Sequence, residues 1–312
     1  MMDQYSKHDQ VLAVLAAAAT GILVGSAIVS TRFVIDQTDP VTLAFLRYFI
    51  GFFLLLIPAW HAAREWFDRR DLVPIALLGI TQFGILIVLM NYGVQFIPSA
   101  RTALIFSSMP LLTMVLAALI GYERMTIFKT VGVLLTMAGV GFALGEKVLH
   151  TTGSPNEWIG ELAVLGSALC GAVCSVLYRP YLRKYATLQV SAFAMFASVV
   201  FLALFAAAQG AFESPFHFTI KGWLAVFFIG AASAVGYYLW LWALGHTSPT
   251  RVTVFLSLSP ITSAVAGALL LAEPISSFFV IGLVCVILGL WLAYRESRVS
   301  LPGAAVDKPD GL

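Results

Sequence analysis

The sequence predicts an all-α integral membrane protein whose ten transmembrane helices form two inverted repeats of five helices each. The first observation behind this prediction is composition: 60% of the 312 residues are hydrophobic and 11% are charged, with a mean hydropathy of +0.92. Soluble domains carry about twice that share of charged residues. The second observation is that the apolar runs are about 20 residues long, enough for a helix to cross the hydrocarbon core, and lack the alternation of a membrane β-barrel.

The third observation is an internal repeat. The stretch from Arg101 to Ala143 recurs from Arg251 to Ala293 at one constant offset, without insertion or deletion. Residue types that are rare in this chain match in register, so chance agreement between apolar residues does not explain the repeat. The matching pairs include Arg101 and Arg251, Ser107 and Ser257, Pro110 and Pro260, Glu123 and Glu273, Gly132 and Gly282, and Gly139 and Gly289. We therefore predict two copies of one unit.

The first repeat, 11–145, is predicted to contain five spans bounded by breakers or charged residues. Its first apolar run is longer than the core of a signal peptide and follows a flank that contains acidic residues, so we expect it to be retained. The spans lie at 11–34, 41–60, 72–95, 98–121 and 126–145. They are separated by Asp36 to Pro40, by the charged run 64–71, by Pro98, and by Glu123 with Arg124.

The second repeat, 158–294, is predicted to contain the other five spans. They lie at 158–179, 187–209, 220–244, 249–271 and 275–294. They are separated by the basic run Arg179 to Lys184, by Glu213 to Lys221, by Ser248-Pro249, and by Glu273-Pro274. The tail 295–312 contains prolines and glycines but few apolar residues, so we expect it to be disordered and cytoplasmic.

Lysine and arginine predict the orientation. If both termini are cytoplasmic, most of the 18 Lys and Arg side chains fall on the cytoplasmic side, as the positive-inside rule requires. Because five spans per repeat is an odd number, the second repeat then crosses the membrane with opposite polarity. Arg101 and Arg251 are expected on opposite faces, an arrangement typical of secondary transporters with a substrate path between the repeats.

Several kinds of chemistry are not supported by the sequence. Cys170, Cys174 and Cys285 all lie within apolar runs, so neither a disulfide framework nor a zinc site is predicted. No Asp or Glu falls in the middle of a predicted span, which argues against a buried cation site and a carboxylate proton relay. We expect no metal, no cofactor and no nucleic-acid partner. The expected partners are a small-molecule substrate and the lipid bilayer.

Polar and aromatic residues inside the predicted spans are candidates for a substrate site. Arg47 is the only charged residue deep within a span, which suggests a function because buried charges are costly; snorkelling to the interface is the alternative. Gln82 lies at the centre of the third span. Tyr237 and Trp240 share one face of the eighth span, where packing or an interfacial aromatic belt is the alternative.

Two equivalent prolines lie near the centres of the fourth and ninth spans, Pro110 and Pro260. A proline inside a helix removes a backbone hydrogen bond and kinks the helix, so we expect this pair to act as hinges, with a packing kink as the alternative. Ser107 and Ser257 precede them by three residues and lie on nearly the same faces. Each serine is expected either to satisfy the freed carbonyl or to face the substrate.

Weaker expectations attach to five further residues. Cys170 in the sixth span is a candidate for the lining, with packing as the alternative. Glu123 and Glu273 fall at helix ends, where each is expected to accept hydrogen bonds from the first amides of the helix that follows. Gly21 and Gly25 form a pair of small residues that predicts close approach of another helix.

Motifs in both repeats are similar to those of a known family. They run Gly25, Pro40 and Leu46-Arg47, then Asn91-Tyr92 and Pro98-Ser99-Ala100, and in the second repeat Trp242-Ala243-Leu244, Ser248-Pro249 and Leu271-Ala272-Glu273. This combination resembles the drug/metabolite transporter superfamily, in its ten-helix branch of two EamA-type repeats, from Val11 to Tyr294. Two positions depart: Val24 stands where members often carry tryptophan, and Arg124 where the second copy has Pro274. The resemblance implies export of small metabolites from the bacterial cytoplasm, typically amino acids.

We therefore predict a multi-pass transporter of the bacterial inner membrane, not an enzyme. It is expected to export small neutral or zwitterionic metabolites by alternating access, with amino acids, aromatic ones included, as the favoured cargo. A monomer is expected to suffice for transport, and the sequence leaves the oligomeric state open. The predicted substrate-binding residues are Gln82, Ser107, Cys170, Tyr237, Trp240, Ser257 and Arg47, the last of which would attract a carboxylate.

Three alternatives remain from the sequence. A sugar-phosphate or nucleotide-sugar carrier would need several buried cations, and Arg47 is the one available. An integral-membrane enzyme acting on lipids would need a cluster of His, Asp, Glu or reactive Cys near the interface. A passive channel differs from a carrier in lacking saturable counterflow.

Overall fold

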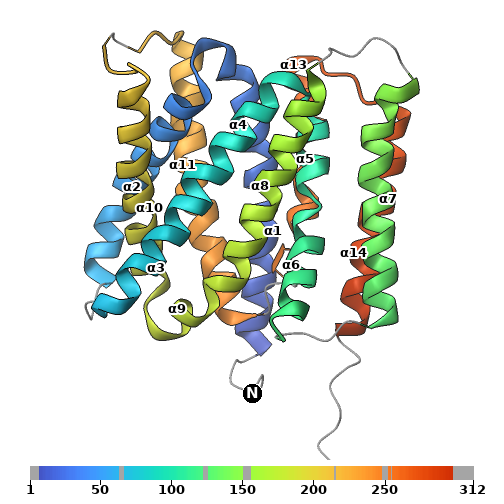
Figure 1. Ribbon diagram of the computed structural model, residues 1–312, viewed down its shortest axis with the longest axis horizontal. Helices are drawn as coiled ribbons and strands as arrows, with labels where there is room; N and C mark the ends of the chain where they lie inside the picture. The colour runs from blue at the N-terminus through green and yellow to red at the C-terminus, as the bar shows by residue number, and fades with distance from the viewer. Residues whose placement is uncertain are drawn as a thin grey trace, which may run out of the picture.

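The computed structural model describes residues 7–62, 67–121, 126–149, 156–213, 216–247, 252–253 and 255–297, and every regular element in these ranges is a helix (Figure 1). The predicted all-α fold is therefore confirmed. Most of the predicted tail lies outside the described residues, as do Glu123, Arg124 and Arg251.

The helices follow one another with short connections in both halves of the chain. In the first half they are α1 (Lys7–Val34), η1 (Ile35–Gln37), α2 (Pro40–Ala62), α3 (Arg69–Gly79), η2 (Ile80–Ile85), α4 (Leu86–Phe96), α5 (Ser99–Phe106), α6 (Met109–Leu119) and α7 (Ile127–Leu149). In the second half they are α8 (Glu157–Leu177), α9 (Arg179–Lys184), α10 (Thr187–Ala208), α11 (Ile220–His246), η3 (Phe255–Ser257), α13 (Leu258–Leu271) and α14 (Ser277–Ser297). η2 is a π-helical turn, whereas η1 and η3 are 3-10 turns.

Six helical stretches are long and apolar enough to cross a membrane. They are Val11–Gln37, Arg69–Phe96, Ser99–Leu119, Glu157–Lys184, Thr187–Ala208 and Ile220–His246. Four shorter apolar helices, Pro40–Leu56, Thr130–Phe142, Leu258–Leu271 and Ser277–Gly289, coincide with the other predicted spans. The chain is thus a multi-pass membrane protein, and the count of ten spans stays a prediction.

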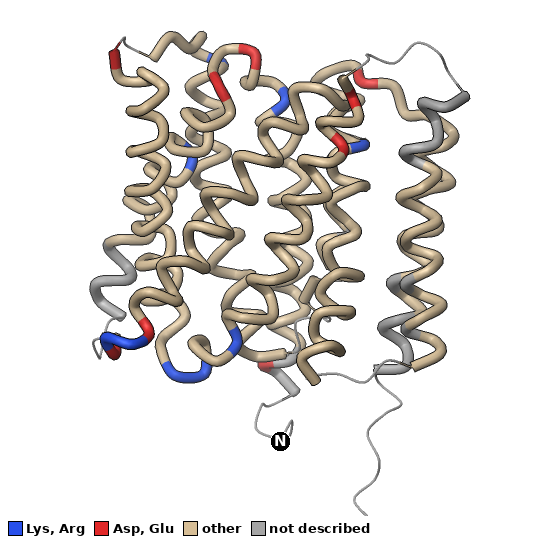
Figure 2. Tube along the Cα trace, in the orientation of Figure 1, with Lys and Arg blue, Asp and Glu red and all other residues tan. Residues whose placement is uncertain are grey.

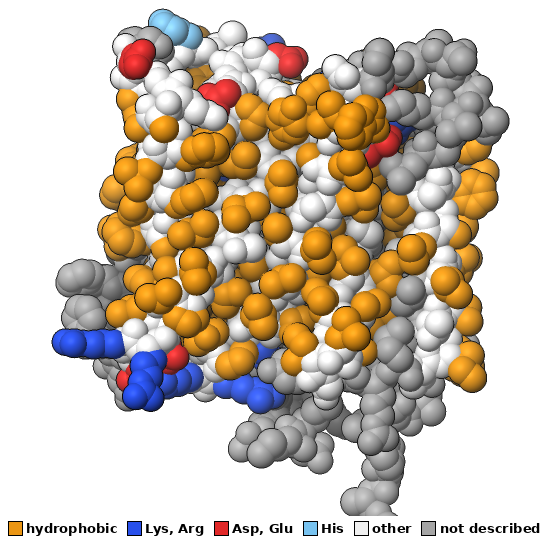
Figure 3. All heavy atoms as spheres, in the orientation of Figure 1, with side chains coloured by type: hydrophobic (Ala, Val, Ile, Leu, Met, Phe, Trp, Pro, Cys, Tyr) orange, Lys and Arg blue, Asp and Glu red, His pale blue; other side chains and the backbone are white. Residues whose placement is uncertain are grey.

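The outer surface of the bundle is apolar between its two ends. Figure 3 shows hydrophobic side chains spread over this middle zone, while charged side chains lie toward the ends. On α11, for example, Leu224, Phe227 and Val235 are all more than half exposed. An exposed apolar belt of this kind is stable only against lipid, because water would make its exposure costly.

The two equivalent prolines sit where helices begin. The fourth span is broken at Ser107 and Ser108, and Pro110 is the second residue of α6. In the ninth span, Pro260 is the third residue of α13, directly after η3. The N–H groups in the first turn of a helix have no partner within the helix, so a proline there costs no hydrogen bond. Each span is therefore divided beside its proline, where the sequence predicted a kink in a continuous helix. A hinge role for the pair stays a prediction.

Glycines allow helices of opposite halves to touch. A side chain at Gly25 would place its Cβ 2.5 Å from the carbonyl oxygen of Ser259, and one at Gly21 would meet the carbonyl oxygen of Phe255. Helix α1 therefore packs directly on η3 and α13, as the small pair predicted. In α8, Gly171 lies close to the side chain of Met109, since a Cβ there would lie 2.8 Å from Met109 Sδ.

Helices α7 and α14 form a pair at one edge of the bundle (Figure 1). A Cβ at Gly139 would lie 2.6 Å from the carbonyl oxygen of Gly282, and a Cβ at Gly289 would lie 2.5 Å from that of Gly132. The contact is reciprocal, because equivalent glycines of the two repeats exchange roles. It explains why these four positions are shared between the copies.

Candidate functional site

A cleft lies between helices of both halves. The first half contributes α1, α2, η2, α4, α5 and α6, and the second contributes α11 and η3. Most of the lining is apolar or aromatic, which suits an amphipathic small molecule. Among the described residues that line it, Arg47 is the one with a charged side chain.

Arg47 is buried, with 7% of its surface exposed, and does not snorkel to the interface. Its Nε donates a hydrogen bond to Ser233 Oγ on α11 at 2.5 Å, and that hydroxyl donates to the carbonyl oxygen of Ile229 at 2.6 Å. Gly230 lacks a side chain where α2 passes, since a Cβ there would lie 2.7 Å from Ile50 Cβ. Close packing of α2 on α11 thus brings the arginine to the serine.

The π-helical turn η2 presents Gln82 and Phe83 to the cleft. Single π-helical turns inside longer helices are frequent at functional sites. Gln82 Oε1 is buried and accepts no hydrogen bond within the described structure. An acceptor in that position is open to a donor on a bound substrate.

An aromatic wall completes the cleft. Tyr237 and Trp240 are three residues apart on α11, so they share a face of the helix. The ring of Tyr237 lies 4.0 Å from that of Phe83 and 5.6 Å from that of Trp240, measured between centroids. Trp240 Nε1 is a buried donor for which the described residues supply no acceptor. These rings can flank an apolar or aromatic group of a ligand.

Four of the seven predicted substrate-binding residues therefore meet in one cleft: Arg47, Gln82, Tyr237 and Trp240. Ser107 and Cys170 are not part of its lining. Ser107 is buried and donates to the carbonyl oxygen of Ala103, and Cys170 is half-buried against the core. The side chain of Ser257 lies outside the described residues.

Thr20, Tyr48 and Ser233 are polar residues of the cleft that were not predicted as substrate-binding. Ser233 orients Arg47, and Thr20 on α1 donates to the carbonyl oxygen of Gly236 at 3.1 Å. Ser233 precedes Tyr237 and Trp240 by four and seven residues, the spacing of one helix face, and that spacing is the signal for it. Thr20 carries no comparable signal.

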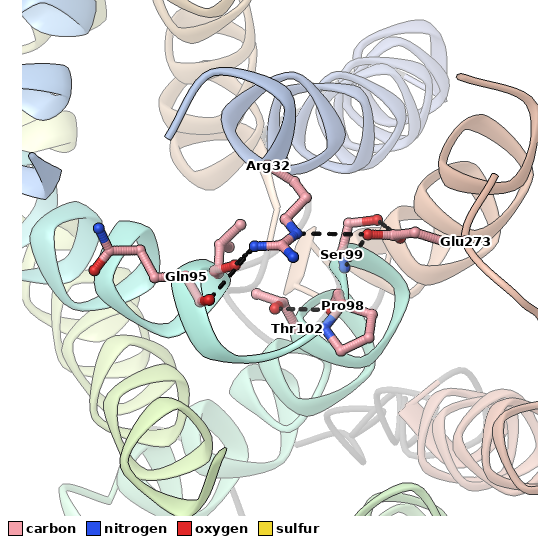
Figure 4. Close-up of polar contacts among 7 residues, drawn as sticks. Arg32, Gln95, Pro98, Ser99, Thr102 and Glu273 are labelled. Carbon is pink, nitrogen blue, oxygen red and sulfur yellow. Dashed lines mark hydrogen bonds and ion pairs between the residues drawn. The ribbon is translucent and has the colours of Figure 1, made fainter. Parts of the chain in front are cut away.

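A second polar cluster joins four segments at one end of the bundle (Figure 4). Glu273, after α13, accepts hydrogen bonds from the backbone N–H of Ser99 at 3.2 Å and from its hydroxyl. Arg32 on α1 lies 3.8 Å from the same carboxylate and donates to the carbonyl oxygens of Val94 at 2.9 Å and Gln95 at 3.4 Å.

The prediction that Glu273 caps the helix that follows it is wrong. Its carboxylate caps α5 of the other half, whereas α14 is capped by Ser276, whose hydroxyl accepts from the N–H of Phe279 at 3.1 Å. The reason is tertiary: α13 packs beside α5, so the first amides of α5 are within reach. Glu123 lies outside the described residues.

A helical bundle with an apolar belt and an internal cleft shared by both halves defines a polytopic membrane protein of the transporter class. The chain belongs to the EamA-like transporter family, whose model matches it twice, at residues 11–145 and 158–295. It is thus an EamA-type member of the drug/metabolite transporter superfamily.

Relatives span nearly the whole chain. An uncharacterized transporter YoaV of Bacillus subtilis is 25% identical over 264 residues, covering 83% of this chain and 88% of that protein. A probable terminal-alkyne amino-acid exporter of Streptantibioticus cattleyicolor is 28% identical over 300 residues, covering 93% and 98%. A solved crystal structure, 20% identical and covering 93% of this chain and 98% of its own, has a TM-score of 0.69, which shows the shared fold.

Proposed function

We propose that this protein is a secondary transporter that exports small neutral or zwitterionic metabolites, amino acids foremost, from the bacterial cytoplasm. The observation that carries the proposal is the cleft: helices of both halves enclose it, and it combines one buried cation with an aromatic wall. The amino-acid exporter among the relatives supports this cargo. A sugar-phosphate carrier is less well supported, since the described lining offers a single cation for a doubly charged group.

In this proposal, the halves are inverted repeats that alternate access to the cleft. Helix contacts support it, because α1 packs on α11 as its counterpart α8 packs on α4. Likewise α1 packs on α13 as α8 packs on α6. Together with the reciprocal glycines of α7 and α14, this is the pattern expected of twofold-related units. The divided spans beside Pro110 and Pro260 are the proposed hinges.

The proposed orientation places both termini in the cytoplasm of a bacterial cell, with the protein in the inner membrane. Figure 2 supports it: runs of Lys and Arg lie at the lower end, where α3 begins and α9 is found, while Asp and Glu gather mainly at the upper end. The lower end is then cytoplasmic by the positive-inside rule.

The test is uptake by proteoliposomes over a panel of amino acids, with and without an imposed pH gradient. Gln82→Ala and Tyr237→Ala are expected to change substrate preference, because both side chains line the cleft. Tyr238→Ala is the matched control: Tyr238 is the next residue on α11 and is not part of the lining, so this variant should keep the wild-type preference. Saturable counterflow is expected of a carrier. Unchanged preference in both cleft variants would reject this lining, and transport without saturation would favour a channel.

A further inference from the structure

The guanidinium of Arg47 is only partly engaged. Its Nε is held by Ser233, and its ring contact is with Tyr48, at 5.4 Å from the ring centroid. Its two terminal nitrogens form no further hydrogen bond or ion pair with the residues that the structure describes, although the side chain is more than nine-tenths buried and lines the cleft. Paired N–H groups of this kind match the two oxygens of a carboxylate.

Charge balance in the cleft points the same way. A buried cation without a counter-ion is costly, and the described lining contains neither Asp nor Glu. A substrate carboxylate would neutralise Arg47. A substrate ammonium would find no acid there, only neutral acceptors such as Gln82 Oε1 and the hydroxyl oxygen of Tyr237. The positive field of the arginine also opposes entry of a cation that lacks a carboxylate.

We infer that Arg47 binds the substrate's carboxylate, and that this carboxylate is required while the amine is dispensable. The cargo class then extends from amino acids to amphipathic monocarboxylates and excludes amines. This inference rests on the proposed function and narrows it. Ser233 is the positioning residue, because its hydroxyl holds Nε while it is itself fixed by the carbonyl oxygen of Ile229.

The experiment compares three ligands that differ in one group: L-phenylalanine, 3-phenylpropionate without the amine, and phenethylamine without the carboxylate. Binding to the purified full-length protein is measured as thermal stabilisation in detergent. Phenylalanine and phenylpropionate are expected to stabilise the wild type, and phenethylamine is not. Arg47→Met should weaken the binding of both carboxylate ligands by about tenfold or more, and Arg47→Lys should bind them with an affinity between those of Arg47→Met and the wild type. Ser233→Ala should reduce the preference for the carboxylate ligands over phenethylamine.

Arg47→Met is expected to fold, because replacing a buried charge with an apolar side chain removes a desolvation cost. Stabilisation by phenethylamine equal to that by phenylpropionate would overturn the inference. So would a carboxylate preference that survives in Arg47→Met, or the lack of any response to both carboxylates. If any of these results were found while the proteoliposomes still transported another substrate of the panel, the proposed transport function would be retained and only the role of Arg47 rejected.

The cluster around Glu273 carries a second, independent inference. Arg32 lies one helical turn beyond Ile28 on α1, and Val94 lies one turn beyond Met90 on α4; both Ile28 and Met90 line the cleft. One turn is about 5 Å along the axis, so the cluster lies just past the end of the cleft. Figure 4 shows Arg32 between Gln95 of α4 and Glu273.

The backbone after α13 is shaped to present Glu273. Ala272 adopts a left-handed φ of 53°, which is unfavourable for a residue with a Cβ, and the next N–H, that of Glu273, donates to the carbonyl oxygen of Gly267 at 3.2 Å. Gly267 also makes room, since a Cβ there would lie 2.7 Å from Glu273 Oε2 and 2.8 Å from Ser99 Oγ.

The geometry points to a latch: the contacts among Arg32, Glu273 and Ser99 hold the cleft closed toward this end, and they must part before substrate can leave there. This assignment also rests on the proposed transport function.

The test places a single cysteine in the cleft, Ala232→Cys, after native cysteines are replaced by serine, and measures labelling by a membrane-impermeant thiol reagent applied from each side. Glu273→Gln and Arg32→Gln are each expected to raise labelling from the latch side by about fivefold and not from the other side. Arg101→Gln is the matched control, since Arg101 pairs with Glu157 at 2.9 Å at the same end without joining the latch. Labelling at the wild-type level in both latch variants, or an equal rise in the Arg101→Gln control, would overturn the latch proposal. Absence of transport by the wild type and by every variant would instead overturn the proposed function.

Discussion

Replacement of Ala232 by tryptophan is expected to reduce transport by about tenfold or more, because the indole would occupy space that the substrate needs. Ala232 lines the cleft from α11, one turn before Gly236 and close to the Arg47 and Ser233 pair. Its own side chain is small, and 7% of its surface is exposed. The enlarged side chain has room only toward the cleft, since interiors elsewhere are close-packed.

The control for this variant is Val235→Trp on the same helix. Val235 is 52% exposed on the lipid-facing side, so the same indole placed there should leave transport close to the wild-type rate. Both proteins are compared by uptake into proteoliposomes at equal amounts of folded protein. Equal activity of the two variants would show that the substrate path does not pass Ala232.

An all-or-none result is expected from labelling equivalent positions of the two repeats. Gln95 and Gly245 are related by the repeat offset, and each is the next-to-last residue of its helix, α4 and α11 respectively. In inverted repeats these positions face opposite sides of the membrane. Gln95→Cys should react with an impermeant reagent on intact cells, whereas Gly245→Cys should react only after permeabilisation.

Both substitutions fit the structure. A Cβ at Gly245 would meet its nearest neighbours at 3.9 and 4.0 Å, an ordinary distance, and Gln95 contributes only its carbonyl oxygen to the latch. The background lacks Cys170, Cys174 and Cys285. If both positions react from outside intact cells, the two repeats run in the same direction and alternating access as proposed is wrong.

Much of the fold and part of the site follow from sequence alone. Apolar runs of membrane-spanning length predict the helices, because a polar backbone in lipid must bond internally. The cost of burying a charge singles out Arg47, and helical spacing groups Tyr237 with Trp240. These are local arguments, and all three residues line the cleft.

Features that depend on contacts between distant segments were not predictable in the same way. Residues 80–85 contain no proline, and a single glycine such as Gly84 is tolerated inside a helix, so the π-helical turn carries no distinct sequence signal. Glu273 caps α5 and not α14 because α13 packs on α5.

The π-helical turn sets the phase of the helix that follows it. Below this turn α3 packs on α10, and above it α4 packs on α8, so the neighbours change at Ile80–Ile85. A π-turn holds one residue more than an α-turn, and deleting that residue would rotate all of α4 by about 100° about its axis. Leu86, Ile87 and Met90 would then turn away from the cleft. The one additional residue of the π-helical turn thus allows α3 to pack on α10 and α4 to pack on α8 within the same span.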